Sequence, residues 1–190
     1  MANNNWYLIE PNYDSSDFVE DIIEKGEVAD PKIATVYGTE EDKFQHNIQY
    51  RDCYTSFIID PDIMDQLLKY FGPVLKKLKY NISHLESLQY TVYDEGHYYN
   101  WHQDNHPAPY EDGTIRKLSM TMFLTDPDEY EGGELEIEFG GPGDNSKIES
   151  FKGKRGSIVF FHSTNWHRVT PVTKGTRKSL VGWFCGQKWK

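Results

Sequence analysis

The chain has 190 residues, enough for one domain with a single sizeable core, and its 15% aromatic content excludes a disordered protein. A formal net charge of −10 argues against a general nucleic-acid binder, because such proteins present a basic face to the phosphates. No apolar run approaches the length of a membrane span, so we expect neither nucleic acid nor membrane as a partner.

The two cysteines, Cys53 and Cys185, are too few for a disulfide scaffold and are typical of reduced thiols in a cytoplasmic protein. The first residues contain neither the basic nor the apolar segment of a signal peptide. We therefore expect a cytoplasmic protein with a single domain over residues 1–190, as a monomer or a weak dimer.

The first 84 residues predict short strands and two amphipathic helices that support the remainder of the chain. Apolar residues recur at helical spacing after Ser16, and Gly26 is expected to end that helix. The same spacing follows Pro61, where Gly72-Pro73 is expected to interrupt a second helix. Residues 38–52 are polar and predict a loop. Short strands are expected over residues 6–10, 32–37 and 57–59.

After Ile82 the pattern changes to strands separated by turns. Apolar residues alternate in Leu118, Met120, Met122 and Leu124, as in a strand with one buried face. Two helices followed by about eight strands predict a mainly β fold, an antiparallel jelly roll with the helices packed on one side and its core over about residues 85–186. The expected strands cover residues 85–93, 98–104, 117–124, 134–139, 147–151, 156–162, 166–172 and 177–185.

A possible metal site begins at His102 and Asp104, which follow a run rich in tyrosine and tryptophan that favours extended chain. Residues two apart in a strand point to the same face, so this imidazole and carboxylate are expected to lie side by side. They would supply two of the three protein ligands in the 2-His-1-carboxylate site, which binds non-haem Fe(II) and leaves positions open.

The third ligand is expected downstream, and His162 and His167 are the two candidates. We favour His167, because Arg177 follows it on the next predicted strand. If that strand is regular, Ser179, Val181 and Trp183 share one face with Arg177.

Five stretches in this order resemble the iron- and 2-oxoglutarate-dependent dioxygenases, in particular the prolyl 4-hydroxylase-like branch. They are LQYTVYDEGHYYNWHQD, RKLSMTMFLTDP, YEGGELEIE, GSIVFFHS and HRVTPVTKGTRKSLVGWF. The resemblance covers about residues 88–186 and implies a double-stranded β-helix. It also implies Fe(II) held by His102, Asp104 and His167.

The same resemblance implies the co-substrate and its ligands. Arg177, ten residues after His167, would bind the far carboxylate of 2-oxoglutarate as a planar, permanently charged group. Tyr93 matches a tyrosine that often binds the same carboxylate, with Tyr90 and Tyr99 as rival candidates. Trp183 is expected to pack against the co-substrate pocket. The resemblance also implies ascorbate as a reductant.

The implied activity is hydroxylation of a prolyl residue in a protein or peptide, with release of succinate and CO₂. Alternatives are hydroxylation of another peptidyl residue, a free amino acid or a small molecule, for which Arg116, Lys117 or Arg168 could supply charge partners. A nucleic-acid demethylase would carry a second arginine where Trp183 stands, and a non-enzymatic jelly-roll module would need no iron ligands. Small relatives in tailed phages leave open a phage-encoded protein that acts in its host's cytoplasm.

Two surface features bear on the substrate. Residues 105–116 form a polar loop that starts directly after Asp104 and is interpreted as a lid over the substrate. Aromatic residues near the ligand positions would form a rim that suits proline-rich chain, which adopts a polyproline II helix. The expected rim residues are Tyr98, Tyr99, Trp101, Tyr110 and Trp166.

Overall fold

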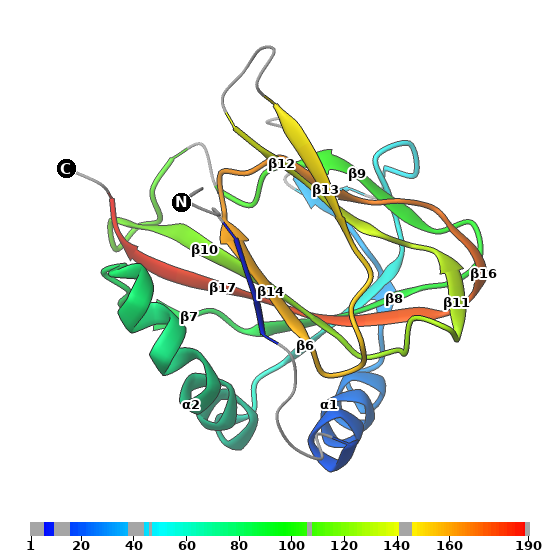
Figure 1. Cartoon of the computed structure of the whole chain (residues 1–190), viewed down its shortest axis with the longest axis horizontal. Helices are drawn as coiled ribbons and strands as arrows, with labels where there is room; N and C mark the ends of the chain where they lie inside the picture. Colours follow the sequence, from blue (N-terminus) through cyan, green and yellow to red (C-terminus); the bar gives the residue numbers. More distant parts are fainter. Residues whose placement is uncertain are drawn as a thin grey trace.

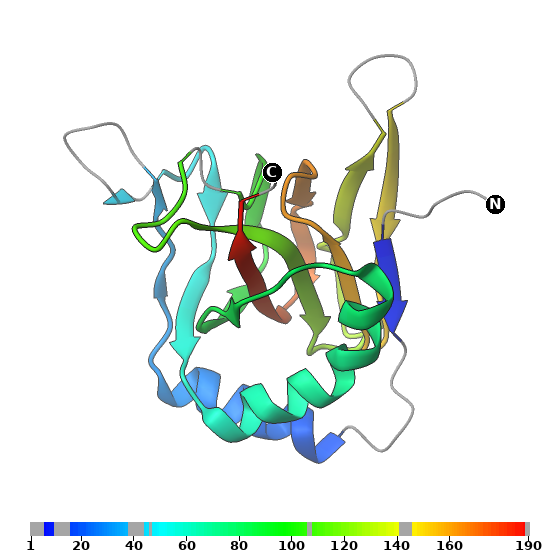
Figure 2. The ribbon, with the colours of Figure 1, turned by 90° about the vertical axis from the view of Figure 1, so that its left-hand side faces the viewer.

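In the computed structural model of this chain, the described residues are 6–9, 16–37, 44–45, 47–105, 108–140 and 146–188. Antiparallel strands hold the largest share of them, and the two helices lie together on one side of the strands (Figures 1 and 2). The mainly β architecture with its helices on one side confirms the jelly roll predicted from the sequence.

The larger sheet has eight strands in the order β1-β14-β10-β17-β8-β6-β2, and β7 pairs with β17. Its strands are β1 (Trp6–Ile9), β2 (Lys32–Ile33), β6 (Tyr54–Ile58), β7 (His84–Leu85), β8 (Leu88–Tyr93), β10 (Thr114–Phe123), β14 (Ile158–His162) and β17 (Arg177–Gln187).

The smaller sheet has five strands in the order β13-β12-β15-β9-β5. These strands are β5 (Arg51–Asp52), β9 (Tyr98–His102), β12 (Leu135–Phe139), β13 (Lys147–Phe151) and β15 (His167–Val169). Two short pairs complete the described strands: β3 (Val36–Tyr37) with β4 (Phe44–Gln45), and β11 (Tyr130–Gly132) with β16 (Val172–Gly175).

The helices α1 (Ser16–Val28) and α2 (Pro61–Leu78) cover one face of the larger sheet. Asp60 caps α2 by accepting from the backbone N–H groups of Asp62 and Ile63, and Pro61 occupies the first turn, where no N–H is needed. The main hydrophobic core lies between helices and sheet. It includes Val19, Ile22, Ile63, Leu67, Leu88, Tyr90, Met120, Leu180 and Phe184.

Two expectations about the helices were wrong. Gly26 does not end α1, which continues to Val28; a Cβ at Gly26 would lie 2.3 Å from Cγ of Tyr90, so this glycine is required where helix and sheet approach closely. Gly72-Pro73 does not interrupt α2, which runs through both residues to Leu78.

Several strand boundaries also differ from the prediction, because pairing partners decide them. Residues 32–37 form two short strands, and the expected loop over 38–52 contains β4 and β5. Residues 166–172 divide between β15 and β16, and β11 was not predicted. The expected strand 98–104 ends at His102, so Asp104 lies beyond it.

The first 84 residues contribute more than support. They supply β1, β2 and β6 to the larger sheet and β5 to the smaller one, which brings part of this segment to the space between the sheets. Neither helix of the described ranges combines the length and the hydrophobicity that a membrane-spanning segment needs.

Candidate functional site

Two histidines lie side by side in the interior of the smaller sheet. His102 ends β9 and His167 begins β15, and the two residues are direct partners in the antiparallel register. The next partners are Tyr99 and Val169, so β9 has one residue more than β15 between these pairs. This bulge allows Tyr99 and His102, three residues apart, to line the same cavity.

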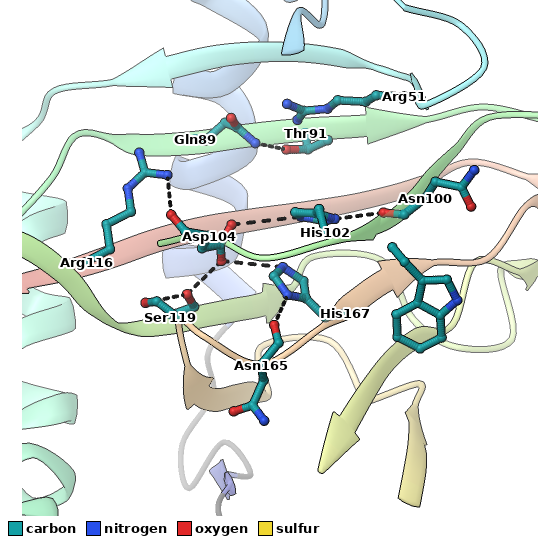
Figure 3. Close-up of polar contacts among 12 residues, drawn as sticks. Arg51, Gln89, Thr91, Asn100, His102, Asp104, Arg116, Ser119, Asn165 and His167 are labelled. Atoms are coloured by element: carbon teal, nitrogen blue, oxygen red, sulfur yellow. Dashed lines mark hydrogen bonds and ion pairs between the residues drawn. The ribbon is translucent and has the colours of Figure 1, made fainter. Parts of the chain in front are cut away.

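Asp104 joins the two histidines from beyond the end of β9 (Figure 3). The sequence argument that a strand places His102 and Asp104 on one face is therefore wrong in its geometry, although the side chains do converge. The backbone N–H of Asp104 donates to the Ser163 carbonyl at 2.9 Å, and its Oδ2 accepts from the Ser119 hydroxyl at 2.6 Å. Ser119 in turn lies 2.9 Å from the Ser163 hydroxyl. These bonds fix the carboxylate where the strand no longer does.

The geometry of the three side chains fits a single ion. One ligand atom from each of His102, Asp104 and His167 lies within 4.8 Å of the other two, and this is the group of metal-binding side chains found among the described residues. Nε2 of His102 is 3.9 Å from Asp104 Oδ1, and Nε2 of His167 is 3.4 Å from Asp104 Oδ2.

The second nitrogen of each imidazole determines its tautomer. Nδ1 of His102 lies 2.8 Å from the Asn100 carbonyl oxygen, and Nδ1 of His167 lies 3.0 Å from that of Asn165. A carbonyl oxygen only accepts, so each Nδ1 carries the hydrogen and each Nε2 presents a lone pair to the shared space.

The charge states also suit metal ligands. Burial, together with the neighbouring His167, lowers the pKa of His102 well below its ordinary value, which keeps this imidazole neutral. Burial alone would raise the pKa of Asp104, but His167, His102 and the Ser119 hydroxyl outweigh it, and the pKa is lowered. Nitrogens of two imidazoles and an oxygen of one carboxylate are the donor set of a non-haem iron site.

Arg177 lies at the start of β17 and is 1% exposed. Its Nη1 donates to the Ser179 hydroxyl at 3.0 Å, whereas Nε and Nη2 have no hydrogen-bond partner within the described part of the chain. A buried guanidinium with unsatisfied donors is costly unless a ligand completes its bonds. Arg177, Ser179, Val181 and Trp183 all line one cavity, as the expected alternation of this strand requires.

Tyr93 is the register partner of Arg177 on β8, and its ring centroid lies 5.2 Å from the guanidinium carbon. It packs with Cys53 in one buried cluster and lines the cavity. The rival candidates differ in place: Tyr99 lines the cavity, whereas Tyr90 faces the helices and donates to Glu27 at 2.6 Å.

Sequence reasoning missed the role of Glu86, for which no motif or spacing gives a signal. Both carboxylate oxygens of Glu86 accept from Arg116, at 2.9 Å from Nε and 2.6 Å from Nη2. The guanidinium of Arg116 then lies over the Trp183 ring at 3.7 Å, and its Nη1 donates to the Asp104 carbonyl at 3.5 Å. Glu86 therefore orients a cation and an indole on the wall of the cavity.

These groups surround one cavity of about 760 Å³, which lies between the two sheets. Of the expected aromatic rim, Tyr99, Tyr110 and Trp166 line it, and Tyr50 and Phe57 join them. Tyr98 and Trp101 do not: Tyr98 donates to the Ile48 carbonyl, and Trp101 lies under Arg168 at 4.9 Å.

His162, the alternative third ligand, lies away from this cavity, as do two lysines that are near Arg177 in the sequence. His162 contacts the Tyr80 hydroxyl through its ring nitrogens, at 2.5 and 2.8 Å, and takes no part in the three-residue cluster. Lys178 bonds to Glu27 on the helix side, and Lys174 bonds to Glu131. In the loop 105–116, the described Tyr110 hydroxyl donates to Glu86 at 3.0 Å.

Comparison with known families decides the broader identity. The family model of the 2OG-Fe(II) oxygenase superfamily matches residues 88–185, about half of the chain. This chain belongs to the 2OG-Fe(II) oxygenase superfamily. The family implies an oxygenase that uses Fe(II) and 2-oxoglutarate, and the buried donor set fits that requirement.

Curated relatives of this oxygenase carry the description PKHD-type hydroxylase. One from Hyphomonas neptunium is 48% identical over 91 residues, which span 47% of this chain and 38% of the relative. Another, from Gloeothece citriformis, is 33% identical over 167 residues, 87% of this chain and 70% of the relative. Several curated relatives are thus more than twice as long as the region that they share with this oxygenase.

Solved structures confirm the fold. A prolyl-4-hydroxylase of Pseudomonas putida superposes with a TM-score of 0.70 at 19% identity, covering 99% of this oxygenase and 95% of that chain. A prolyl hydroxylase of Trichoplax adhaerens, in complex with a peptide fragment of the hypoxia inducible factor oxygen degradation domain, gives a TM-score of 0.62 at 19% identity, with 96% and 84% covered.

Proposed function

We propose that this oxygenase hydroxylates a prolyl residue in an extended segment of a protein or peptide, with conversion of 2-oxoglutarate to succinate and CO₂. The observation that carries the proposal is the shared cavity of about 760 Å³. The cavity is lined by the cluster of His102, Asp104 and His167 and by the buried Arg177, whose Nε and Nη2 have no hydrogen-bond partner within the described residues.

In this proposal His102 and His167 hold Fe(II) through Nε2, and Asp104 holds it through a carboxylate oxygen. Three protein ligands leave coordination positions for the co-substrate and O₂. Arg177 binds the far carboxylate of 2-oxoglutarate through its unpaired nitrogens. The side chains of Tyr93 and Trp183 line the same pocket. When bound, iron and 2-oxoglutarate supply the oxidation that places one oxygen atom of O₂ on a substrate C–H bond.

The chain's own contribution is positioning and exclusion of water. Glu86 holds the guanidinium of Arg116 flat against Trp183, where its Nη1 can turn towards a substrate carbonyl oxygen. The buried serine hydroxyls hold Asp104 in one orientation. Rings of the rim enclose the approach to the metal ligands, among them Tyr99, which stacks on His102 with a centroid separation of 3.6 Å.

A proline-containing polypeptide is favoured by two observations. The cavity is lined by large rings, including Phe57 and Trp166, which are 56% and 47% exposed at its mouth, and such rings suit proline-rich chain. The solved structures that share this fold include prolyl hydroxylases, one of them with a peptide bound.

The cations considered for a free amino acid are already engaged. Arg116 is paired with Glu86, Arg168 with Glu136, and Lys117 donates to the Asn81 carbonyl at 3.4 Å.

The proposal is tested by incubating the protein with Fe(II), 2-oxoglutarate, ascorbate and proline-containing peptides. We expect a gain of one oxygen atom on proline together with an equal amount of succinate. Free amino acids and peptides in which alanine replaces proline are the controls. Oxidation of free amino acids without modification of any proline peptide would refute the prolyl assignment and leave the iron site intact.

A further inference from the structure

A second buried arginine lines the cavity and has no role in the chemistry described above. Arg51 lies on β5, opposite Tyr99 of β9, and is 7% exposed. Arg51 lines the same cavity as His102, Asp104 and His167, and Figure 3 draws it together with them. Its guanidinium carbon lies 4.4 Å from the Tyr99 ring centroid, and Tyr99 stacks on His102.

The bonds of Arg51 within the described ranges leave its charge without a counterion. Nε donates to the Cys53 sulfur at 3.2 Å, and Nη2 has no hydrogen-bond partner. No ion pair joins Arg51 to a carboxylate of these ranges, whereas Arg116, another cation of the cavity wall, has Glu86. Burying a guanidinium without a counterion destabilises the folded chain unless a ligand supplies the missing charge.

The Cys53 thiol does not supply the missing negative charge. Burial raises the pKa of Cys53, and this effect exceeds the opposing influence of Arg51. Tyr93 is also neutral, because burial raises the pKa of its hydroxyl. The Tyr99 ring therefore contacts the guanidinium of Arg51, and Nη2 remains available to a hydrogen-bond acceptor.

The charges of the proposed complex point to the kind of acceptor. The formal charges sum to zero for Fe(II), the Asp104 carboxylate, doubly ionised 2-oxoglutarate and Arg177. Arg116 and Glu86 cancel one another, so Arg51 adds one positive charge that neither the described lining residues nor the co-substrate offsets. In a water-poor cavity such a charge favours an anionic ligand group.

We infer that Arg51 binds a carboxylate of the primary substrate, close to the residue that is oxidised. The inference rests on the proposed function and specifies its substrate class. Only the Tyr99 ring separates the guanidinium from His102, so an acidic side chain within about two residues of the target proline would reach it, since extended chain advances about 3.3–3.6 Å per residue. A free α-carboxylate, at the end of a peptide or on a small amino acid, offers the same chemistry.

The first experiment changes the substrate and leaves the enzyme intact. A host peptide with one proline carries aspartate at each position from three residues before the proline to three after, with a matched asparagine series. A further pair ends at the proline as free acid or as amide, and free proline is a separate arm. Wild-type enzyme should favour one carboxylate position over its neutral match by on the order of ten- to a hundredfold in kcat/KM, mainly through KM.

The second experiment tests whether Arg51 causes the preference. Arg51→Gln should reduce the preference to within about threefold and Arg51→Lys should keep part of it, while the exposed Lys147→Gln, which removes the same charge, should keep it in full. Peptide affinity for the Mn(II)- and 2-oxoglutarate-loaded protein without O₂, measured by calorimetry, should show the same differences without turnover.

Three results would overturn the inference, and they are distinguishable. Proline hydroxylation with equal efficiency for all acidic and neutral matches would refute the role of Arg51 and leave the proposed function standing. A weaker 2-oxoglutarate affinity in Arg51→Gln with an unchanged peptide preference would make Arg51 a co-substrate ligand. Absence of any modified proline, with 2-oxoglutarate still consumed, would refute the proposed function itself and the inference with it.

Discussion

The two faces of the larger sheet bury different kinds of side chain, and three of its strands, β8, β10 and β17, show the difference. Towards the helices, β8, β10 and β17 present apolar side chains, among them Tyr90, Met120 and Leu180. Towards the smaller sheet, alternate residues of these strands are polar and equally buried, namely Gln89, Thr91, Ser119, Thr121, Arg177 and Ser179.

This difference shows which face holds the fold together and which face carries the site. Apolar side chains are stabilised by burial itself, whereas a buried polar group must find a partner. On the cavity face Arg177 keeps donors without partners within the described ranges, as Arg51 does on the smaller sheet opposite, so part of the cavity wall is completed only by ligands. A buried polar stripe in strands of a β-rich protein is therefore a sign of a binding site.

The largest effect is expected from removing the carboxylate at the metal cluster. Asp104→Ala should abolish iron binding, because two imidazoles remain without the anionic ligand. Iron per chain, measured by colorimetric chelation after anaerobic loading, should fall to background. His162→Ala is the matched control, since His162 contacts Tyr80 outside the cluster and should leave the iron content unchanged. Loss of iron in the control with retention in His167→Ala would reverse the assignment of the distal histidine.

Part of the cavity face was predictable from sequence, because side chains two residues apart in a strand point to the same face. The two-residue period of a strand was enough to predict that one face of β17 carries Arg177, Ser179, Val181 and Trp183. All four line the cavity. The convergence of His102, Asp104 and His167 also followed from the order of the motifs. The reason given for His102 and Asp104 was wrong, because β9 ends at His102 and a tertiary bond to Ser163 positions Asp104.

The features that sequence reasoning missed depend on contacts between distant segments. The role of Glu86 depends on its bond to Arg116, 30 residues away in the sequence. The role of Arg51 depends on Tyr99, its partner in the strand register. Gly26 looked like a helix stop, yet the glycine is required by the ring of Tyr90 on a strand far along the chain. Propensity and spacing are local signals, so they cannot report which element a residue will meet.

A stability comparison sharpens the contrast between the faces. Leu180→Ala, on the helix face, should lower the free energy of unfolding by about 2–5 kcal/mol, because it leaves a cavity in a fully buried core. Its neighbour Val181 lines the open cavity, so Val181→Ala should cost less than about 1.5 kcal/mol. Chemical denaturation of both variants measures the two values. Equal losses would show that the cavity face contributes to the core as much as the helix face.

A charge comparison tests the same strand for function. Arg177→Gln should raise the Kd for 2-oxoglutarate on the order of a hundredfold, about 2.7 kcal/mol, since a carboxylate loses its charged bidentate partner. Lys178→Gln removes the same charge one residue away, but Lys178 bonds to Glu27 on the helix face and the Kd should not change. Both values can be measured by calorimetry with Mn(II) in place of iron. Weaker binding in Lys178→Gln alone would move the carboxylate site to the other face.

The smallest effect is expected at Ser119, whose hydroxyl touches the metal cluster only through Asp104. Ser119 is fully buried, donates to Asp104 Oδ2 at 2.6 Å, and is the next residue along β10 from Leu118 of the apolar face. Ser119→Ala keeps the carboxylate but releases one of its oxygens, so the affinity for Mn(II) or Co(II) should weaken about tenfold, as for other residues that orient metal ligands.

Ser119→Thr restores a hydroxyl at the same position and should recover most of the affinity. Leu118→Val, a conservative change on the helix face, is the matched control and should leave metal affinity unchanged while lowering stability slightly. Equal metal affinity in the wild type and Ser119→Ala would show that the backbone bond from Asp104 to Ser163 alone positions the carboxylate.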